Sequence, residues 1–211
     1  MTKIKYFIVV LFSFLFLFFS ISFINNYLPD NETLAGDIPS SHFIAPNIYN
    51  PLEKQGPYMC SGYSASFVKQ YYNLQADASN SYQQMSYSIP FFHGVPPFRL
   101  VNHLNTNQFN TSFYRGTLRD LFFHVSEERP VIVLVGEGLS WQHYLVLVGY
   151  DIEQEKIYFY NPEQAFIPEN NIMMGNNTRS FDEFKKIWAN GLPIYNHLYI
   201  PANLTPNHLN T

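Results

Sequence analysis

The first half of the chain has apolar residues at the spacing of an α-helix. Four of them fall on one helical face: Tyr63, Phe67 and Tyr71 within residues 61–73, and Leu74 directly after them. Their spacings of four, four and three positions match the helical period of about 3.6 residues. We therefore expect this segment to be an amphipathic helix.

Two further segments of the first half combine a helical pattern with residues that begin helices. Residues 97–104 start with Pro97. The first turn of a helix tolerates proline, because N–H groups in that turn have no helical partner. Thr117 precedes residues 118–125 and is followed three positions later by Asp120, as in a capping signal. Each pattern predicts a short helix.

The second half of the chain has the pattern of β-strands. Short runs rich in β-branched and aromatic residues occupy residues 131–135, 144–150 and 156–160. The link between the last two runs is short enough for an antiparallel hairpin. Ser180 and Glu183 form a capping box that predicts a helix as far as Trp188, and a last strand follows at residues 196–200.

Helices first and strands afterwards favour an α+β fold over an alternating parallel one. The chain has 211 residues, of which 46% are hydrophobic and 18% aromatic, enough for one well-filled core. The net charge of −4 provides no basic surface for nucleic acid. We expect one domain over residues 47–201 and a C-terminal tail over residues 202–211.

The N-terminus carries an uncharged apolar run, residues 6–24, after Lys3 and Lys5. A helix needs about 17–25 apolar residues to cross a bilayer, so this run is long enough. The lysines favour keeping that end in the cytoplasm and the rest outside. Residues 1–25 are therefore predicted to be a transmembrane anchor, or alternatively a cleaved signal peptide. Residues 26–46, with several prolines, are predicted to be a linker to an extracytoplasmic domain.

Cys60 is the single cysteine of the chain, so neither an internal disulfide nor a multi-cysteine zinc site is available. It lies where a loop with Gly56 and Pro57 gives way to the first predicted helix. The N–H groups and the dipole at a helix N-terminus favour an anion, and they lower the pKa of a thiol. This position suits a reactive nucleophile. The alternative is an inert thiol buried as a small apolar residue.

A nucleophilic thiol needs a base and a group that orients the base. Of seven histidines, His143 begins an otherwise apolar strand and could point back toward Cys60. Asn161 ends the next strand, where its amide oxygen could accept the N–H of the imidazole, because antiparallel neighbours bring such ends together. Gln55 lies five residues before Cys60, and its amide could stabilise an oxyanion.

Each of these residues also has a simpler explanation. His143 alone could be structural, and Gln55 alone could be a surface residue. Asn161 precedes a proline, which is typical of a turn. His197 also lies near a strand start and is the main alternative base. The histidines are scattered without an H-E-x-x-H motif, so we expect no metal site and no cofactor.

Five short segments, together with Gln55, form a recognisable series. They are residues 60–68 (CSGYSASFV), 116–121 (GTLRDL), 129–135 (RPVIVLV), 143–151 (HYLVLVGYD) and 160–162 (YNP). With them the chain resembles the bacteriocin-processing, double-glycine-leader cysteine peptidases of bacteria, which belong to the papain-like superfamily. The resemblance covers residues 47–201. Its most specific part is the strand from His143 to Gly-Tyr-Asp, followed by a strand and Asn-Pro.

This resemblance implies a papain-like α+β fold. Its helical N-terminal half would carry the nucleophile at a helix N-terminus and would pack on a C-terminal antiparallel β-sheet. By the same resemblance, Cys60 is the nucleophile and His143 the base. Asn161 orients the base, and Gln55 is the oxyanion donor.

The chain departs from the family pattern at two places. The family usually has Asp where this chain has Asn161, although papain-like relatives use Asn. The family also has Gly-Pro directly after the cysteine, whereas Ser61 and Gly62 follow Cys60 here. The second departure concerns the substrate cleft more than the chemistry. No Walker-type phosphate-binding motif is present, so cleavage coupled to export is not implied.

The sequence thus favours a membrane-anchored, extracytoplasmic cysteine peptidase or amide hydrolase with a peptide or protein as its substrate. It would be secreted instead if the N-terminal segment is cleaved. The alternative is an inactive papain-like domain that binds peptides or a partner protein. Acyl transfer to a nucleophile other than water would use the same residues.

Overall fold

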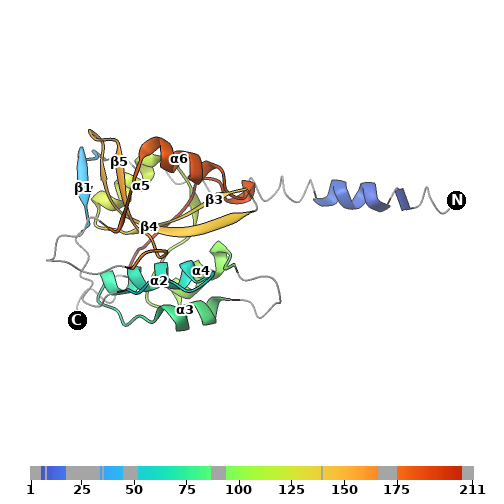
Figure 1. Ribbon diagram of the computed structural model, residues 1–211, viewed down its shortest axis with the longest axis horizontal. Helices are drawn as coiled ribbons and strands as arrows, with labels where there is room; N and C mark the ends of the chain where they lie inside the picture. Colours follow the sequence, from blue (N-terminus) through green and yellow to red (C-terminus); the bar gives the residue numbers. More distant parts are fainter. Residues whose placement is uncertain are drawn as a thin grey trace.

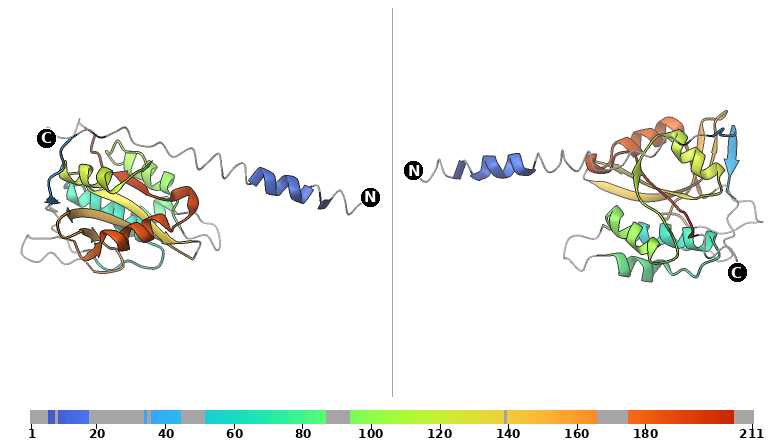
Figure 2. Two further views of the ribbon diagram at one scale, coloured as in Figure 1. Left: turned by 90° about the horizontal axis from the view of Figure 1, so that it is seen from above. Right: turned by 180° about the vertical axis from the view of Figure 1, so that it is seen from behind.

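An antiparallel sheet separates two groups of helices (Figure 1). The computed structural model describes residues 6–7, 9–17, 34, 36–44, 52–86, 94–138, 140–165 and 175–205. On one side of the sheet lie α2 (Cys60–Tyr71), α3 (Ala78–Met85) and α4 (Pro97–Asn105). On the other side lie α5 (Leu118–Ser126) and α6 (Phe181–Ala189), and the right-hand view of Figure 2 shows the same layers from behind.

The sheet is formed by strands from both halves of the chain. They are β1 (Ser41–Phe43), β2 (Tyr114–Arg115), β3 (Val131–Glu137), β4 (Trp141–Asp151), β5 (Lys156–Tyr160), β6 (Asn177–Ser180) and β7 (Leu198–Pro201). Their order is β2-β7-β3-β4-β5-β6, β1 pairs with the end of β4, and every pairing is antiparallel. A short 3₁₀ helix, η1 (Pro193–Tyr195), precedes β7. This architecture confirms the predicted α+β fold, with a helical first half packed on an antiparallel sheet.

Side chains alternate along β4 between two hydrophobic cores. Tyr144, Val146 and Val148 belong to the core under α2 and α4. Leu145 and Leu147 belong to the core under α5 and α6. Successive residues of a strand point to opposite faces, so the unbroken apolar run of β4 follows from burial on both sides.

The helix predicted over residues 61–73 is α2, and Cys60 is its first residue. The capping boxes predicted for α5 and α6 are both present. Gly62 of α2 packs directly against α3, since a Cβ there would collide with the Ala78 carbonyl and with Tyr82. The glycine that follows Ser61 is therefore explained by close helix packing.

Five elements were not expected from the sequence: α3, η1, β1, β2 and β6. The strands are only two to four residues long, and α3 buries only Ser81 and Met85, so neither type has a clear apolar period. β1 lies within residues 26–46, so part of the predicted linker belongs to the sheet. β4 begins at Trp141, which makes His143 its third residue instead of its first.

The apolar run at residues 6–24 is described only at residues 6–7 and 9–17, which are helical with exposed side chains. Over the described parts of the chain, no helix is long and apolar enough to cross a membrane. The remainder of the predicted run lies outside the described residues. The membrane anchor and the signal peptide both stay predictions.

Phe67 joins α2 to the sheet, because its ring stacks on Tyr160 with centroids 4.5 Å apart and planes at 13°. The side chain is fully buried. We predict that Phe67→Ala lowers the free energy of unfolding by about 3–5 kcal/mol, through lost burial and the cavity it leaves. Urea denaturation checks this. Phe98→Ala is the control, with 45% of that residue exposed and an expected change within about 0.5 kcal/mol.

Candidate active site

Cys60 is presented by a tight turn that ends where α2 begins. The N–H of Met59 donates to the Gly56 carbonyl at 3.3 Å, and Tyr58 takes a left-handed backbone conformation with φ of 65°. No side chain caps the first turn of α2. The backbone N–H groups at this end of the helix are thus directed at the region of the thiol.

Burial raises the pKa of the Cys60 thiol to about 11. Hydrogen bonds from the backbone of Tyr144 and Ser61 oppose this increase but do not cancel it. The thiol therefore does not have the lowered pKa expected at a helix N-terminus, because the loss of water around the sulfur outweighs the effect of the helix N–H groups. The contact with Tyr144 places the thiol beside β4, one residue from His143.

His143 and Asn161 lie on the same face of the sheet and bond to each other. Nε2 of His143 lies 2.9 Å from Oδ1 of Asn161. Both residues are buried, with 2% and 5% of their surfaces exposed. Burial lowers the pKa of His143, and the hydrogen bond to Asn161 partly offsets this decrease. Trp141 stacks on the imidazole with ring centroids 5.5 Å apart and limits access to it.

Asn161 serves a turn and holds the histidine at the same time. Its Oδ1 accepts a second hydrogen bond, from the backbone N–H of Glu163 at 3.0 Å. Two N–H groups therefore converge on this atom, as expected for a carbonyl oxygen. Since that oxygen can only accept, Nε2 of His143 carries the proton and Nδ1 keeps its lone pair. Asn161 therefore takes part in a turn and also contacts His143, while its role in orienting a catalytic base stays a prediction.

Asn176 fixes the backbone of Asn161, although no sequence pattern marks it as a site residue. Its Oδ1 accepts from the Asn161 N–H at 2.7 Å, and its Nδ2 donates to the Asn161 carbonyl at 3.0 Å. Nδ2 also lies 3.1 Å from the Gln164 carbonyl. Gly175 makes this possible, because its φ of +79° lets the backbone lie against Phe159 where a Cβ would collide. Asn176 comes from an irregular stretch with no periodic pattern.

Gln55 reaches this region through its backbone. Its N–H donates to the Pro162 carbonyl at 2.9 Å, which ties the loop before α2 to the turn after Asn161. Its side-chain Oε1 is buried and has no hydrogen-bond partner within the described residues. The structure thus brings Gln55 near Asn161, while its role as an oxyanion donor stays a prediction.

His197, the alternative base, lies elsewhere in the fold. The ring of His197 packs edge-on against Trp188 of α6, with centroids 5.0 Å apart. The backbone N–H of His197 donates to the Trp188 carbonyl. Within the described residues, no three His, Cys, Asp or Glu side chains form a group that could hold a metal ion.

A cavity of about 480 Å³ opens beside Cys60. The residues that line it are Tyr58, Cys60, Gly94, Val95, Pro96, Pro97, Leu134, Gln142, Tyr144, Leu192, Ile194 and Tyr195. Tyr144 donates its hydroxyl to the Val95 carbonyl at 2.9 Å, which joins the loop before α4 to β4. Gln142 accepts from the N–H of Leu192 at 3.3 Å and so holds the segment before η1 at the cavity.

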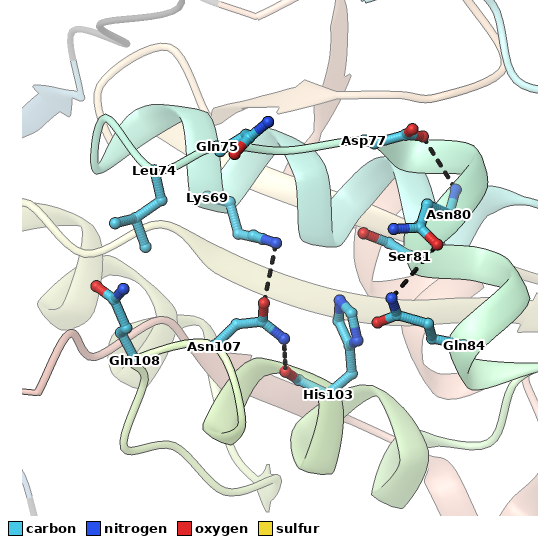
Figure 3. Close-up of a pocket in the computed structure, with 10 residues that line it drawn as sticks. All are labelled: Lys69, Leu74, Gln75, Asp77, Asn80, Ser81, Gln84, His103, Asn107 and Gln108. Carbon is cyan, nitrogen blue, oxygen red and sulfur yellow. Dashed lines mark hydrogen bonds between the residues drawn. The ribbon is translucent and has the colours of Figure 1, made fainter.

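A second cavity, of about 460 Å³, lies among α2, α3 and α4 and has a different character (Figure 3). Its polar side chains largely bond to one another, as in the contact from Lys69 Nζ to Asn107 Oδ1 at 3.1 Å. Gln84 likewise donates to Asn80. None of the four predicted site residues lines this cavity. The cavity that contains Cys60 is therefore the candidate active site.

Comparison with known proteins decides the family. The profile of the peptidase C39 like family matches residues 46–192. The chain belongs to the peptidase C39-like family. This confirms the resemblance drawn from residues 47–201. No curated protein sequence matches the chain.

Three solved structures of peptidases share the fold at low sequence identity. The peptidase domain of Streptococcus ComA, a bifunctional ABC transporter of a quorum-sensing pathway, is 16% identical, with a TM-score of 0.56 over 74% of this chain and 99% of that domain. A protein described as a C39-like peptidase from Bacillus anthracis is 14% identical, with a TM-score of 0.58 over 77% and 96%. A double glycine motif protease of an AMS/PCAT transporter, solved with its leader peptide, is 14% identical, with a TM-score of 0.53 over 78% and 99%.

We predict that Asn176→Ala destabilises this C39-like domain by about 1–3 kcal/mol, because the Asn161 N–H loses its partner in a buried setting. Asn176→Asp should recover part of this loss, since it can still accept from that N–H but cannot donate to the carbonyl groups. Urea denaturation measures both. The exposed Asn102→Ala on α4 is the control. Equal stability of Asn176→Ala and the native protein would contradict the assigned contacts.

Proposed function

We propose that the protein is a cysteine peptidase that hydrolyses peptide or amide bonds, with Cys60, His143 and Asn161 as its catalytic residues. The observation that carries this proposal is the 2.9 Å contact between His143 Nε2 and Asn161 Oδ1, on a strand whose next residue contacts the Cys60 thiol. Membership of the peptidase C39-like family supports it.

The His143–Asn161 contact assigns a direction to proton transfer. Because Nε2 carries a proton toward Asn161, the free lone pair is on Nδ1, which is the nitrogen available to the thiol. Nδ1 would take the proton from Cys60 as sulfur attacks the substrate carbonyl carbon. The resulting imidazolium would give that proton to the leaving amine as the C–N bond breaks. Water would then release the acyl group, with His143 again as the base.

The raised pKa of Cys60 and the lowered pKa of His143 favour a neutral thiol and a neutral imidazole before substrate binds. Proton transfer would then accompany the attack instead of preceding it. The negative oxygen that forms on the substrate would accept from the N–H groups at the start of α2. Gln55 is proposed as a further donor, supported by its link to the turn after Asn161.

The proposed substrate is a peptide or a protein. The structure of the double glycine motif protease holds a leader peptide, which supports a peptide ligand for this fold. We further propose that the domain acts outside the cytoplasm and is held at the membrane by residues 6–24, since the lysines before this run favour that orientation.

A binding domain without catalysis is the second candidate function, favoured by one observation. A thiol with a pKa near 11 is almost entirely protonated at neutral pH and is a weak nucleophile on its own. Such a domain would hold a peptide at the cavity and leave it intact. Activity measurements on variants separate the two functions.

We predict that Cys60→Ala and His143→Ala reduce peptide cleavage to the background rate. Asn161→Ala should lower the rate about 10- to 1,000-fold, because the imidazole loses its orientation and its tautomer. Cleavage of a peptide library, followed by mass spectrometry, measures this. His197→Asn, which suits the left-handed backbone at that residue, should stay within about threefold. Cleavage by native protein that persists in Cys60→Ala would exclude the proposed nucleophile.

We predict that alkylation of Cys60 by iodoacetamide in the free protein accelerates about tenfold per pH unit from pH 7 to about 10. The reason is that the pKa of about 11 leaves thiolate scarce over this whole range. Glutathione, as an ordinary thiol, provides the reference and should level off near its own lower pKa. A rate for Cys60 that is already constant between pH 5 and 8 would show a preformed thiolate and would contradict the neutral pair.

A further inference from the structure

The cavity beside Cys60 has apolar walls that come from four separate parts of the chain. Leu134 of β3 and Tyr144 of β4 lie opposite each other in the sheet and form its floor. Val95 lies in the segment before α4, and Ile194 lies in η1. Leu134, Tyr144 and Val95 are each less than 8% exposed, so the floor is part of the packed core.

Hydrogen bonds hold the cavity in shape, and they already pair the polar groups of Tyr144 and Gln142 with other parts of the protein. The Tyr144 hydroxyl donates to Val95, and the Gln142 amide bonds to Leu192 and to the carbonyls of Gly138 and Trp141. What remains to face a ligand is mainly hydrocarbon. A preformed apolar cavity of 300–1,000 Å³ is of the size that binds small apolar groups in general.

Side chains along β4 alternate between its two faces, so this cavity and the imidazole of His143 lie on opposite faces. Tyr144 and Gln142 point to the cavity, whereas His143 and Trp141 point to the opposite face, where Asn161 lies. The thiol of Cys60 contacts the strand between these two sets of side chains. A peptide bound with its carbonyl at Cys60 would therefore have an apolar cavity on one side and the imidazole on the other.

The geometry points to a specificity site: the cavity bounded by Val95, Leu134 and Ile194 holds a bulky aliphatic or aromatic side chain of the substrate. This inference rests on the proposed function and deepens it. Since Cys60 itself lines the cavity and an extended chain advances about 3.3–3.6 Å per residue, the occupant lies within about two residues of the scissile bond. A pair of glycines at those positions would leave the cavity empty.

Two alkylating probes test the cavity without requiring any cleavage. Iodoacetamide and N-benzyl-iodoacetamide carry the same reactive group, but only the second carries a ring. Their rate ratio on glutathione gives the intrinsic difference in reactivity. On the native protein we expect the ratio of the benzyl-probe rate to the iodoacetamide rate to be at least tenfold higher than on glutathione, because burial of the ring holds the probe at the thiol.

Variants at the floor and at the rim locate the effect. Leu134→Trp fills the cavity, and Ile194→Arg places a charge on the half-buried rim. Both should bring the rate ratio of the two probes back to within about twofold of the glutathione value. Ile152→Arg is the control. Ile152 lies on the turn between β4 and β5, is 40% exposed and does not line the cavity, so this variant should keep the native ratio. Thermal melts identify any variant that fails to fold, and Ile194→Arg remains available if Leu134→Trp does.

Cleavage of a peptide library provides the second part of the test. The inference predicts Leu, Ile, Met, Phe or Tyr at one fixed position within two residues of the cleaved bond, with glycine depleted there. Selective labelling without any cleavage would support the cavity and overturn the proposed hydrolysis. Cleavage between glycines with no selective labelling would support hydrolysis and overturn the cavity. A native ratio within twofold of glutathione overturns the inference by itself.

Discussion

The proposed chemistry of this protein depends on one buried hydrogen bond, from His143 Nε2 to Asn161 Oδ1. Without it, the imidazole would be a buried polar group with no fixed tautomer, and either ring nitrogen could carry the proton. With it, the lone pair is confined to Nδ1. The bond itself depends on Asn176, which pairs with both backbone groups of Asn161, and on Gly175, which lets that segment approach the end of β5.

The strand β4 organises the rest of the site through the alternation of its side chains. One face carries the imidazole, and the other carries the floor of the cavity beside Cys60. The packing of Phe67 on Tyr160 helps to set the distance between α2 and β5, and thus between Cys60 and the turn at Asn161. Core packing on both faces of one sheet therefore positions groups that are far apart in the sequence.

Much of this could be predicted from the sequence, because strong local patterns determine it. The helical period after Cys60, the capping boxes and the long apolar runs of β3 and β4 fixed the main elements, and the chain order of Cys60, His143 and Asn161 indicated the family. The pKa of Cys60 could not be predicted, because it depends on how much protein surrounds the sulfur. Asn176 was missed because its contacts are with the backbone of Asn161, which only folding brings close to it. The short strands β1, β2 and β6 were missed because they are too short to show a periodic pattern.

The most direct test of this account is the protonation state of His143, measured by two-bond ¹H–¹⁵N correlation spectra on the ¹⁵N-labelled protein from pH 4 to 8. We expect a neutral imidazole at pH 7 with its proton on Nε2, and a transition to imidazolium only below the ordinary histidine pKa of about 6.5. Asn161→Ala should abolish the preference for this tautomer. An imidazolium at pH 7, or a proton on Nδ1, would contradict the account.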